Sequence, residues 1–294
     1  MMGRLTSAQR HLAAGFECYR SLHRRLNTSP PGHHPEVLCA NYLGLTLWHL
    51  GSIEKAFQSS DEAIALAREC EHPFSIGGAL TSRAWMEQMN GDVQAAKAAA
   101  AEALEIGERF GIPVLQAFGG PVLAWAMAKT GAPEAAAAEL EKGLEQYRQQ
   151  SYGAMQTYFL GLLAQCWLLA GRLDDAMSTV EVAQRCAIAT GERAWEPELH
   201  RLRGELRLRQ TPNERQGAAR SFNLGLVVAR RQRARSMELS VLTTMARSGA
   251  ASDSGTTMRE LAKCVDEFPR GLRTPALDEA RGLLSGRGSK ALAS

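Results

Sequence analysis

A glycine followed five residues later by an alanine recurs along the chain at intervals of 40 residues. The motif begins at Gly51, Gly91, Gly131 and Gly171. Internal repeats with periods of roughly 20–50 residues are typical of solenoids and related arrays. In such arrays each unit buries its apolar surface only against its neighbours. The repeat therefore predicts that this chain of 294 residues forms one elongated array, in place of two globular domains.

The segments between the repeated glycines have the pattern of helices. Apolar residues recur every three or four positions, and alanine and leucine dominate. Proline stands close to several predicted helix starts, in the tripeptides at His34, His72, Ile112 and Glu196, where its missing N–H is not needed. The repeated glycines can adopt a positive φ and close a short turn. We therefore expect antiparallel pairs of helices joined at these glycines.

Small residues occupy fixed positions relative to the turn glycines. Seven residues before them stand Gly44, Ala84, Ala124 and Ala164, with Gly204 next in the series; five after stand Ala56, Ala96, Ala136 and Ala176; twelve after stand Ala63, Ala103, Gly143 and Ala183. A bulky side chain at a close helix contact typically costs about 1–3 kcal/mol. These columns indicate where neighbouring helices approach each other.

This spacing of small residues resembles the tetratricopeptide repeat, a helix–turn–helix unit of about 34 residues. The resemblance implies an all-α fold, a right-handed superhelix of about 11–12 antiparallel helices in units of 40 residues. We expect units at 1–32, 33–72, 73–112, 113–151, 152–192, 193–234 and 235–284, followed by a disordered tail at 285–294. The period weakens after Gly171: Thr211–Asn213 replaces the turn glycine, and Ser248–Thr257 is expected to be a flexible loop.

Several segments resemble a narrower family, the C-terminal tetratricopeptide region of large bacterial signalling ATPases that carry a class III adenylate/guanylate cyclase domain. The matching segments are "LGLTLWHLG" at Leu43, "ALARECEHPFSIGGAL" at Ala65, "AWEPELHRLRGEL" at Ala194, "ARSMELSVLTTMAR" at Ala234 and "GLRTPALDEARGLL" at Gly271. The chain has no G-x-x-x-x-G-K-[ST] phosphate loop, and no segment with the paired aspartates of a cyclase. The resemblance therefore covers only the scaffold region of such proteins.

Composition and motifs argue against several functions. The net charge of +3 gives no global attraction to nucleic acids or anionic membranes. The six cysteines form no C-x-x-C pair, which favours buried thiols over disulfides. No apolar stretch reaches the length of about 20 residues that spans a bilayer, so we expect a cytoplasmic protein. We expect no catalytic residues, metal or cofactor, because His33, His34 and His200 lack neighbouring ligands or nucleophiles.

The candidate binding site is the concave groove that the first helix of each tetratricopeptide unit would line. By that resemblance, the groove residues expected to bind a partner are Asn41, Leu45, Trp85, Gln88, Trp125, Tyr158, Gln165, Glu198, Arg201 and Glu205. Trp85 and Trp125 occupy the same column, so their rings are expected to be neighbours. Aromatic anchors often dominate recognition; the alternative is that both rings pack between helices.

Arginine is concentrated between Arg193 and Arg235, with eleven arginines against four glutamates, while Glu87 to Glu145 carries nine acids against four bases. We interpret the run at Ala229–Ser236 as a solvated helix end in preference to a nucleic-acid site. The function expected is a non-catalytic scaffold that holds a protein or peptide segment in its groove, in signalling. Two alternatives stay open: the C-terminal regulatory fragment of a cyclase or signalling ATPase, and the sensor module of a transcriptional activator. The oligomeric state is left open.

Overall fold

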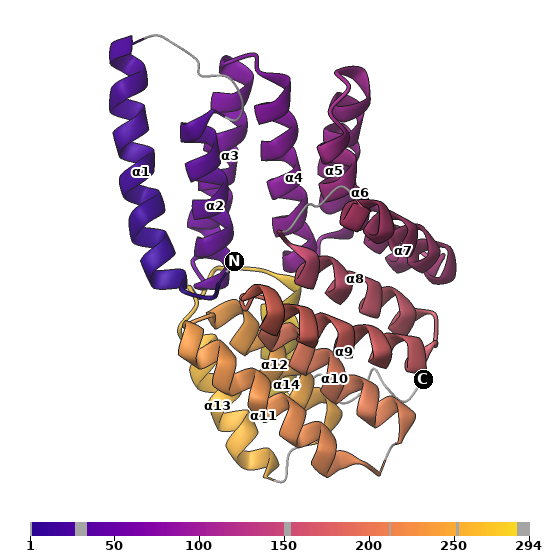
Figure 1. Cartoon of the computed structure of the whole chain (residues 1–294). Helices are drawn as coiled ribbons and strands as arrows, with labels where there is room; N and C mark the ends of the chain where they lie inside the picture. The colour runs from indigo at the N-terminus through magenta and orange to yellow at the C-terminus, as the bar shows by residue number, and fades with distance from the viewer. Residues whose placement is uncertain (1, 27–33, 150–153, 212, 251–252, 287–294) are drawn as a thin grey trace. The chain divides into compact units, whose positions relative to one another are not determined.

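The computed structural model describes residues 2–26, 34–149, 154–211, 213–250 and 253–286, with side chains at 22–26 excepted. These ranges hold fourteen α-helices and no strand, which confirms the all-α prediction (Figure 1). The helices are α1 (Leu5–Leu26), α2 (Pro35–His49), α3 (Ile53–Glu69), α4 (Pro73–Asn90), α5 (Val93–Arg109), α6 (Pro113–Lys129), α7 (Pro133–Gln149), α8 (Gln156–Leu169), α9 (Leu173–Thr190), α10 (Glu196–Gln210), α11 (Arg215–Gln232), α12 (Arg235–Ser248), α13 (Ser254–Asp266) and α14 (Pro275–Leu284).

The chain divides into two compact units, which we call the N-terminal unit (Arg4–Tyr152) and the C-terminal unit (Gly153–Ser294 together with Met1–Gly3). In the N-terminal unit, each helix from α1 to α6 packs on the next helix in the chain. The first helices of its repeats also pack on one another, α2 on α4 and α4 on α6. Each repeat is therefore a helix pair stacked on its neighbour, as the 40-residue period predicts.

The C-terminal unit repeats this arrangement with α8 to α14. The pairs α8–α9, α10–α11 and α12–α13 each form a hairpin of helices, and α14 packs on α12 and α13. The first helices again contact one another, α8 with α10, α10 with α12 and α12 with α14. Side chains from these four helices can therefore meet along one face of the unit.

The glycines of the repeated motif close the turns between the paired helices. Gly51, Gly91, Gly131 and Gly171 all have positive φ, between 74° and 111°, a region that is open to glycine without a Cβ clash. The alanines five residues after them are fully buried, and so are Ala63, Ala103 and Ala183 in the column twelve residues after. The expectation that small residues mark close helix contacts is confirmed at these positions.

Two expectations for the C-terminal region were wrong. The helix count exceeds the eleven or twelve expected, and half of the predicted flexible loop at 248–257 is helical, because α12 ends at Ser248 and α13 begins at Ser254. The side chain of Asp253 caps this helix by accepting a hydrogen bond from the Thr256 N–H, 3.1 Å away. An N-cap aspartate satisfies one of the free N–H groups of a first helical turn. Residues 251–252 and 287–294 of the predicted loop and tail lie outside the described residues.

Gly204 offers a direct test of the small-residue columns. A Cβ at this position of α10 would lie 2.6 Å from the ring of Phe222, which is fully buried. We expect Gly204→Ala to lower the free energy of unfolding by about 1–3 kcal/mol through overpacking, although alanine favours a helix. The measurement is urea denaturation followed by circular dichroism. The control is Gly282→Ala in α14, where nothing lies near the added Cβ and a gain of up to about 1 kcal/mol is expected. A Gly204→Ala variant as stable as the wild type would contradict the packing argument.

Candidate functional site

The predicted groove residues of the N-terminal unit are all buried. Asn41, Leu45, Trp85, Gln88 and Trp125 expose between 1% and 5% of their surface. The two tryptophans therefore pack between helices, which is the alternative to exposure in a groove. Side chains this deeply covered can shape a surface but offer little area of their own to a partner.

Trp85 is held by an aromatic chain that links three helices. Its ring lies edge-on to Phe118 with centroids 5.8 Å apart, and Phe118 lies edge-on to Tyr147 of α7 at 5.7 Å. The indole N–H donates to the carbonyl of Phe118 at 3.0 Å. Edge-to-face pairs add about 0.5–1.5 kcal/mol beyond burial. Trp85 thus fixes α4 against α6. The second tryptophan, Trp125, has the ammonium group of Lys129 at 5.9 Å from the centre of its ring.

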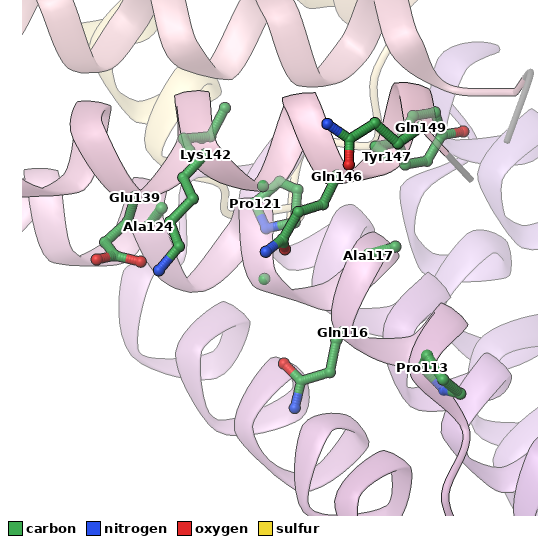
Figure 2. A pocket seen from close by; sticks show the side chains of 13 residues that line it. Pro113, Gln116, Ala117, Pro121, Ala124, Glu139, Lys142, Gln146, Tyr147 and Gln149 are labelled. Atoms are coloured by element: carbon green, nitrogen blue, oxygen red, sulfur yellow. The ribbon is translucent and has the colours of Figure 1, made fainter. Parts of the chain in front are cut away.

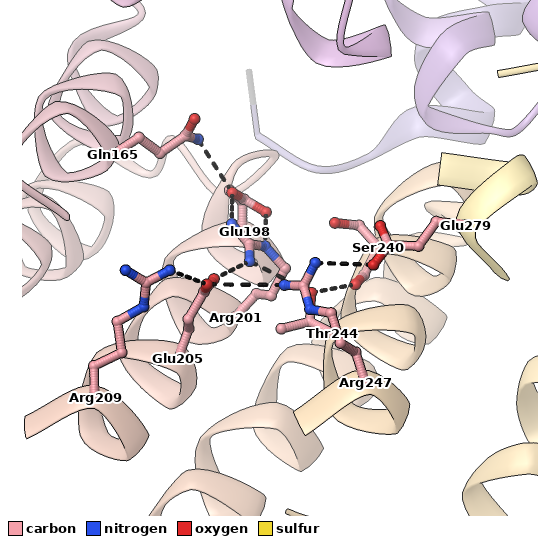
Figure 3. Close-up of polar contacts among 9 residues, drawn as sticks. All are labelled: Gln165, Glu198, Arg201, Glu205, Arg209, Ser240, Thr244, Arg247 and Glu279. Atoms are coloured by element: carbon pink, nitrogen blue, oxygen red, sulfur yellow. Dashed lines mark hydrogen bonds and ion pairs between the residues drawn. The ribbon is translucent and has the colours of Figure 1, made fainter. Parts of the chain in front are cut away.

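In the C-terminal unit, four of the predicted groove residues meet in one polar network (Figure 3). Gln165 of α8 donates to Glu198 at 3.2 Å, and Arg201 donates to Glu198 and Glu205 at 2.7 Å. Glu198 and Arg201 are three residues apart on α10, and Arg201 and Glu205 four, which places all three on one face of the helix. The network therefore links α8 to one face of α10.

The network continues across the first helices of the following repeats. Glu205 is also approached by Arg209 at 3.3 Å and by Arg247 of α12 at 3.8 Å, and Arg247 pairs with Glu279 of α14 at 2.9 Å. Arg201 lies 3.4 Å from the hydroxyl of Thr244. Three arginines and three glutamates from α10, α12 and α14 balance one another, so the network ties the stack together without a net charge.

The pKa directions of Arg201 and Glu205 keep both groups charged at neutral pH. Burial alone would lower the pKa of Arg201, but the carboxylates of Glu198 and Glu205 raise it above its ordinary value. Burial would raise the pKa of Glu205, yet the charge of Arg201 outweighs this, and the pKa of that carboxyl is lowered. A general acid or base needs a pKa near the working pH. Arg201 and Glu205 are therefore fixed charges, and their contacts make them part of the packing between α10 and its neighbours.

Tyr158, the remaining groove candidate, is 3% exposed and lies edge-on to Trp195 with centroids 4.8 Å apart. Burial raises the pKa of its hydroxyl well above the ordinary value. The same indole leaves no room for a side chain at Gly161, because a Cβ there would lie 2.3 Å from the Trp195 Nε1 atom. Tyr158 is therefore part of the packing between α8 and the start of α10.

A hollow of about 480 Å³ opens between α6 and α7 of the N-terminal unit (Figure 2). Its lining is mostly apolar and includes three glutamine amides and one charge of each sign. The lining residues are Pro113, Gln116, Ala117, Gly120, Pro121, Ala124, Glu139, Leu140, Lys142, Gly143, Gln146, Tyr147 and Gln149. Its volume is in the range of pockets that hold small ligands or a short stretch of peptide.

Two helical glycines keep this hollow open. A Cβ on Gly120 or on Gly143 would have no atom within 4 Å. In the other repeats the column of Gly143 is filled by alanines that are fully buried. Glycine inside a helix costs roughly 0.5–1 kcal/mol relative to alanine, and no close packing offsets that cost here. The glycines expose the backbone of both helices to whatever enters the hollow.

Pro121 adds a backbone acceptor at the same place. It lies inside α6, and a proline there cannot donate to the carbonyl four residues earlier. That carbonyl belongs to Ala117, which lines the hollow. The amides of Gln116 and Gln146 have no hydrogen-bond partner among the described residues, and both point toward the hollow in Figure 2. The hollow therefore presents several free hydrogen-bonding groups and little net charge.

This hollow lies outside the predicted groove, because seven of its thirteen lining residues come from α7, the second helix of a repeat. The available signals were Gly143 standing where other repeats have alanine, and Pro121 inside a helical segment. The groove columns were transferred from a resemblance that assigns the binding surface to first helices. The side chains that they contain are engaged in packing or in the Arg201 network.

The other candidates remain without a site. Among the described residues, no group of three or more His, Cys, Asp or Glu side chains could hold a metal ion, and His33 lies outside that part of the chain. The His34 N–H donates to Ser75 at 3.0 Å. Burial lowers the pKa of His200, whose ring lies 3.5 Å from the amide of Gln184. All six cysteines are free thiols. No helix in the described ranges is long and apolar enough to cross a membrane.

Comparisons with known proteins agree with the helical-repeat architecture. No family model matches the chain. An uncharacterized protein of Rhizobium meliloti (strain 1021) is 24% identical over 209 residues, which is 71% of this chain and 20% of that protein, so the chain spans about a fifth of its length. Among solved structures, a Rap protein complexed with competence and sporulation factor superimposes with a TM-score of 0.62 at 12% identity, over 92% of this chain and 76% of that one. The chain has a tetratricopeptide-like fold.

Proposed function

We propose that the chain is a non-catalytic helical-repeat scaffold that binds an uncharged peptide segment in the hollow between α6 and α7. The observation that carries this proposal is the hollow itself, with its open glycines and its free amides. A similar fold is found in a Rap protein whose structure was solved in complex with competence and sporulation factor. That likeness supports a binding role for the fold.

The chemistry of the hollow favours a peptide over a charged metabolite. A glutamine amide offers one carbonyl acceptor and an NH₂ donor, which matches the N–H and C=O of a peptide bond. Gln116 on α6 and Gln146 on α7 can each engage a backbone in this way, and the carbonyl of Ala117 can accept from an N–H. Glu139 and Lys142 contribute opposite charges, so a strongly charged ligand would meet one repulsive group. The apolar part of the lining suits a small aliphatic side chain.

Filling the hollow is expected to abolish binding without harming the fold. In Gly143→Leu, the new side chain has open space and replaces a helix-destabilising glycine. The probes are peptides selected from a random phage-displayed library on the full chain and then measured by fluorescence anisotropy. We expect at least an about tenfold weaker binding, about 1.4 kcal/mol, for Gly143→Leu.

The matched control is Gly282→Leu in α14, another helical glycine with nothing within 4 Å of its Cβ, which should bind as the wild type does. If the selected peptides bind the wild type, Gly143→Leu and Gly282→Leu equally well, the peptide site is not the hollow between α6 and α7. A library that enriches no peptide on the wild-type chain would contradict the peptide-binding role itself.

A second candidate is that this region is the regulatory segment of a much longer protein, of the cyclase or signalling-ATPase kind that its sequence resembles. The relative of which it covers only 20% favours this candidate. The test is an immunoblot of source cells with an antibody against this segment. A band near the 31.9 kDa of this chain would contradict it, and a band several times heavier would support it.

A further inference from the structure

The outer face of α11 carries an exposed apolar patch between two arginines. Leu224 and Val227 are 54% and 63% exposed, and Arg220 and Arg231 are exposed beside them. Counted from Arg220, these positions are four, seven and eleven residues apart, so the four side chains follow one face of the helix. We call this set the α11 stripe. The opposite face of α11, with Phe222 and Leu226, is buried in the C-terminal unit.

The arginines of the α11 stripe differ from most others in the arginine-rich segment. Of the eleven arginines from Arg193 to Arg235, seven form ion pairs with glutamates. Arg220 and Arg231 have no acidic partner among the described residues, and neither have Arg215 and Arg233. Two unpaired cations flanking apolar side chains form a surface that complements an acidic helix with small residues.

A face of that kind exists on α7 of the same chain. Glu134, Ala138, Glu141 and Glu145 have the same spacing of four, seven and eleven residues, and all four are exposed. We call this set the α7 stripe. Glu145 also has an exposed i,i+3 partner in Arg148, a surface ion pair of the kind that contributes little. The two stripes match in length and have opposite charge.

We propose that the α11 stripe of one molecule docks on the α7 stripe of a second copy of this chain. With the helices antiparallel, Arg220 faces Glu145 and Arg231 faces Glu134. The exposed surface of Val227 is then covered by Ala138 and by the aliphatic stems of the glutamates. This proposal does not rest on the proposed peptide site, because Gly143 lies about half a turn and Gln146 about a third of a turn away from the α7 stripe on the helix.

The contact is head-to-tail, since each copy offers a different face, and such contacts build rings or open chains. Eleven residues of helix span only about 16 Å. The surface that so short a contact can bury is therefore well below the roughly 800 Å² per partner of stable complexes. The association should therefore be weak, dependent on concentration and sensitive to salt. Exposed charges are largely screened beyond about 10 Å at 0.1 M ionic strength.

The test is sedimentation equilibrium of the full chain over a range of concentrations. The wild type should show a mass that rises with concentration and falls toward the monomer as salt is added. R220E/R231E and E134R/E145R should each sediment as monomers, because both stripes of each variant then carry the same sign of charge. An equimolar mixture of the two variants should associate again, because the unchanged α7 stripe of one can bind the unchanged α11 stripe of the other, and the two reversed stripes also have opposite charges. The control is R215E/R270E, which changes the net charge by the same amount at exposed arginines outside the stripe.

The control should associate as the wild type does. A wild type that remains monomeric at every concentration would overturn the proposal. So would a control as defective as R220E/R231E, or a mixture that fails to associate although circular dichroism shows both variants folded. Leu224→Gln, which leaves every charge in place, should weaken association through the apolar part of the stripe alone.

Discussion

Arg201→Met is expected to lower the free energy of unfolding of the C-terminal unit by about 3–5 kcal/mol. The side chain of Arg201 is 12% exposed and bridges Glu198 and Glu205, whose side chains are 8% and 17% exposed. Methionine fills a similar volume but leaves two carboxylates buried close together without their cation. The destabilisation arises from these uncompensated charges more than from the loss of the ion pairs.

Two further variants isolate this cause, with urea denaturation of the full chain as the measurement. Arg209→Met removes a half-exposed arginine that also pairs with Glu205, and it should cost no more than about 1 kcal/mol. The triple variant R201M/E198Q/E205Q removes the charges together and should recover much of the loss, as replacing a whole buried ionic cluster often does. If Arg201→Met lowered the free energy of unfolding no more than Arg209→Met does, Arg201 would not stabilise the packing of the helices as its contacts indicate.

Acidification is expected to destabilise the N-terminal unit by up to about 3 kcal/mol through His49 alone. His49 is 1% exposed near the end of α2, and burial lowers its pKa from 6.5 to about 4. Unfolded chains take up this proton near pH 6.5, but the folded chain takes it up only near pH 4. Between these values the unfolded state binds more protons, so stability falls as the pH falls. Each pKa unit corresponds to about 1.36 kcal/mol.

Carboxylates titrate in the same range, so the measurement is a comparison of two chains. The free energy of unfolding is followed from pH 7 to about pH 4 for the wild type and for His49→Gln, which is neutral throughout. The free energy of unfolding of the wild type minus that of His49→Gln should be constant above pH 6.5. Below that pH this difference should fall, because only the wild type loses the contribution of a neutral His49. Parallel curves over the whole range would show that His49 is not held neutral by burial.

Much of the local architecture could be predicted from the sequence. The glycine at each turn adopts a conformation that other residues adopt only with strain, so the sequence alone identifies Gly91 and Gly171 as turn positions. The alanine columns are recognisable for a related reason, because a helix contact at Ala96 or Ala176 leaves no room for more than a methyl group. Where the period failed, at Thr211–Asn213, the helix pair still formed, since apolar spacing continued on both sides.

The candidate site was less predictable. Column positions show which face of a helix a residue lies on, but they do not show what covers that face. Trp85 and Glu198 were both correctly placed on first helices, yet Phe118 covers one and Arg201 neutralises the other. The hollow beside Gly143 arises from the absence of close atoms, and an absence of packing has no signature in a single sequence.

The sequence by itself determined the all-α repeat, the turn positions and the close helix contacts, because each depends on a local property of the residue: its backbone freedom, its size or its helical period. Only the tertiary structure decided which of the eleven arginines between Arg193 and Arg235 are paired, which tryptophans are covered and where the surface is left open. Those outcomes depend on partners some 30 to 45 residues distant, as with Arg201 and Thr244 or Trp85 and Phe118, and pairing at that range follows from how helices stack.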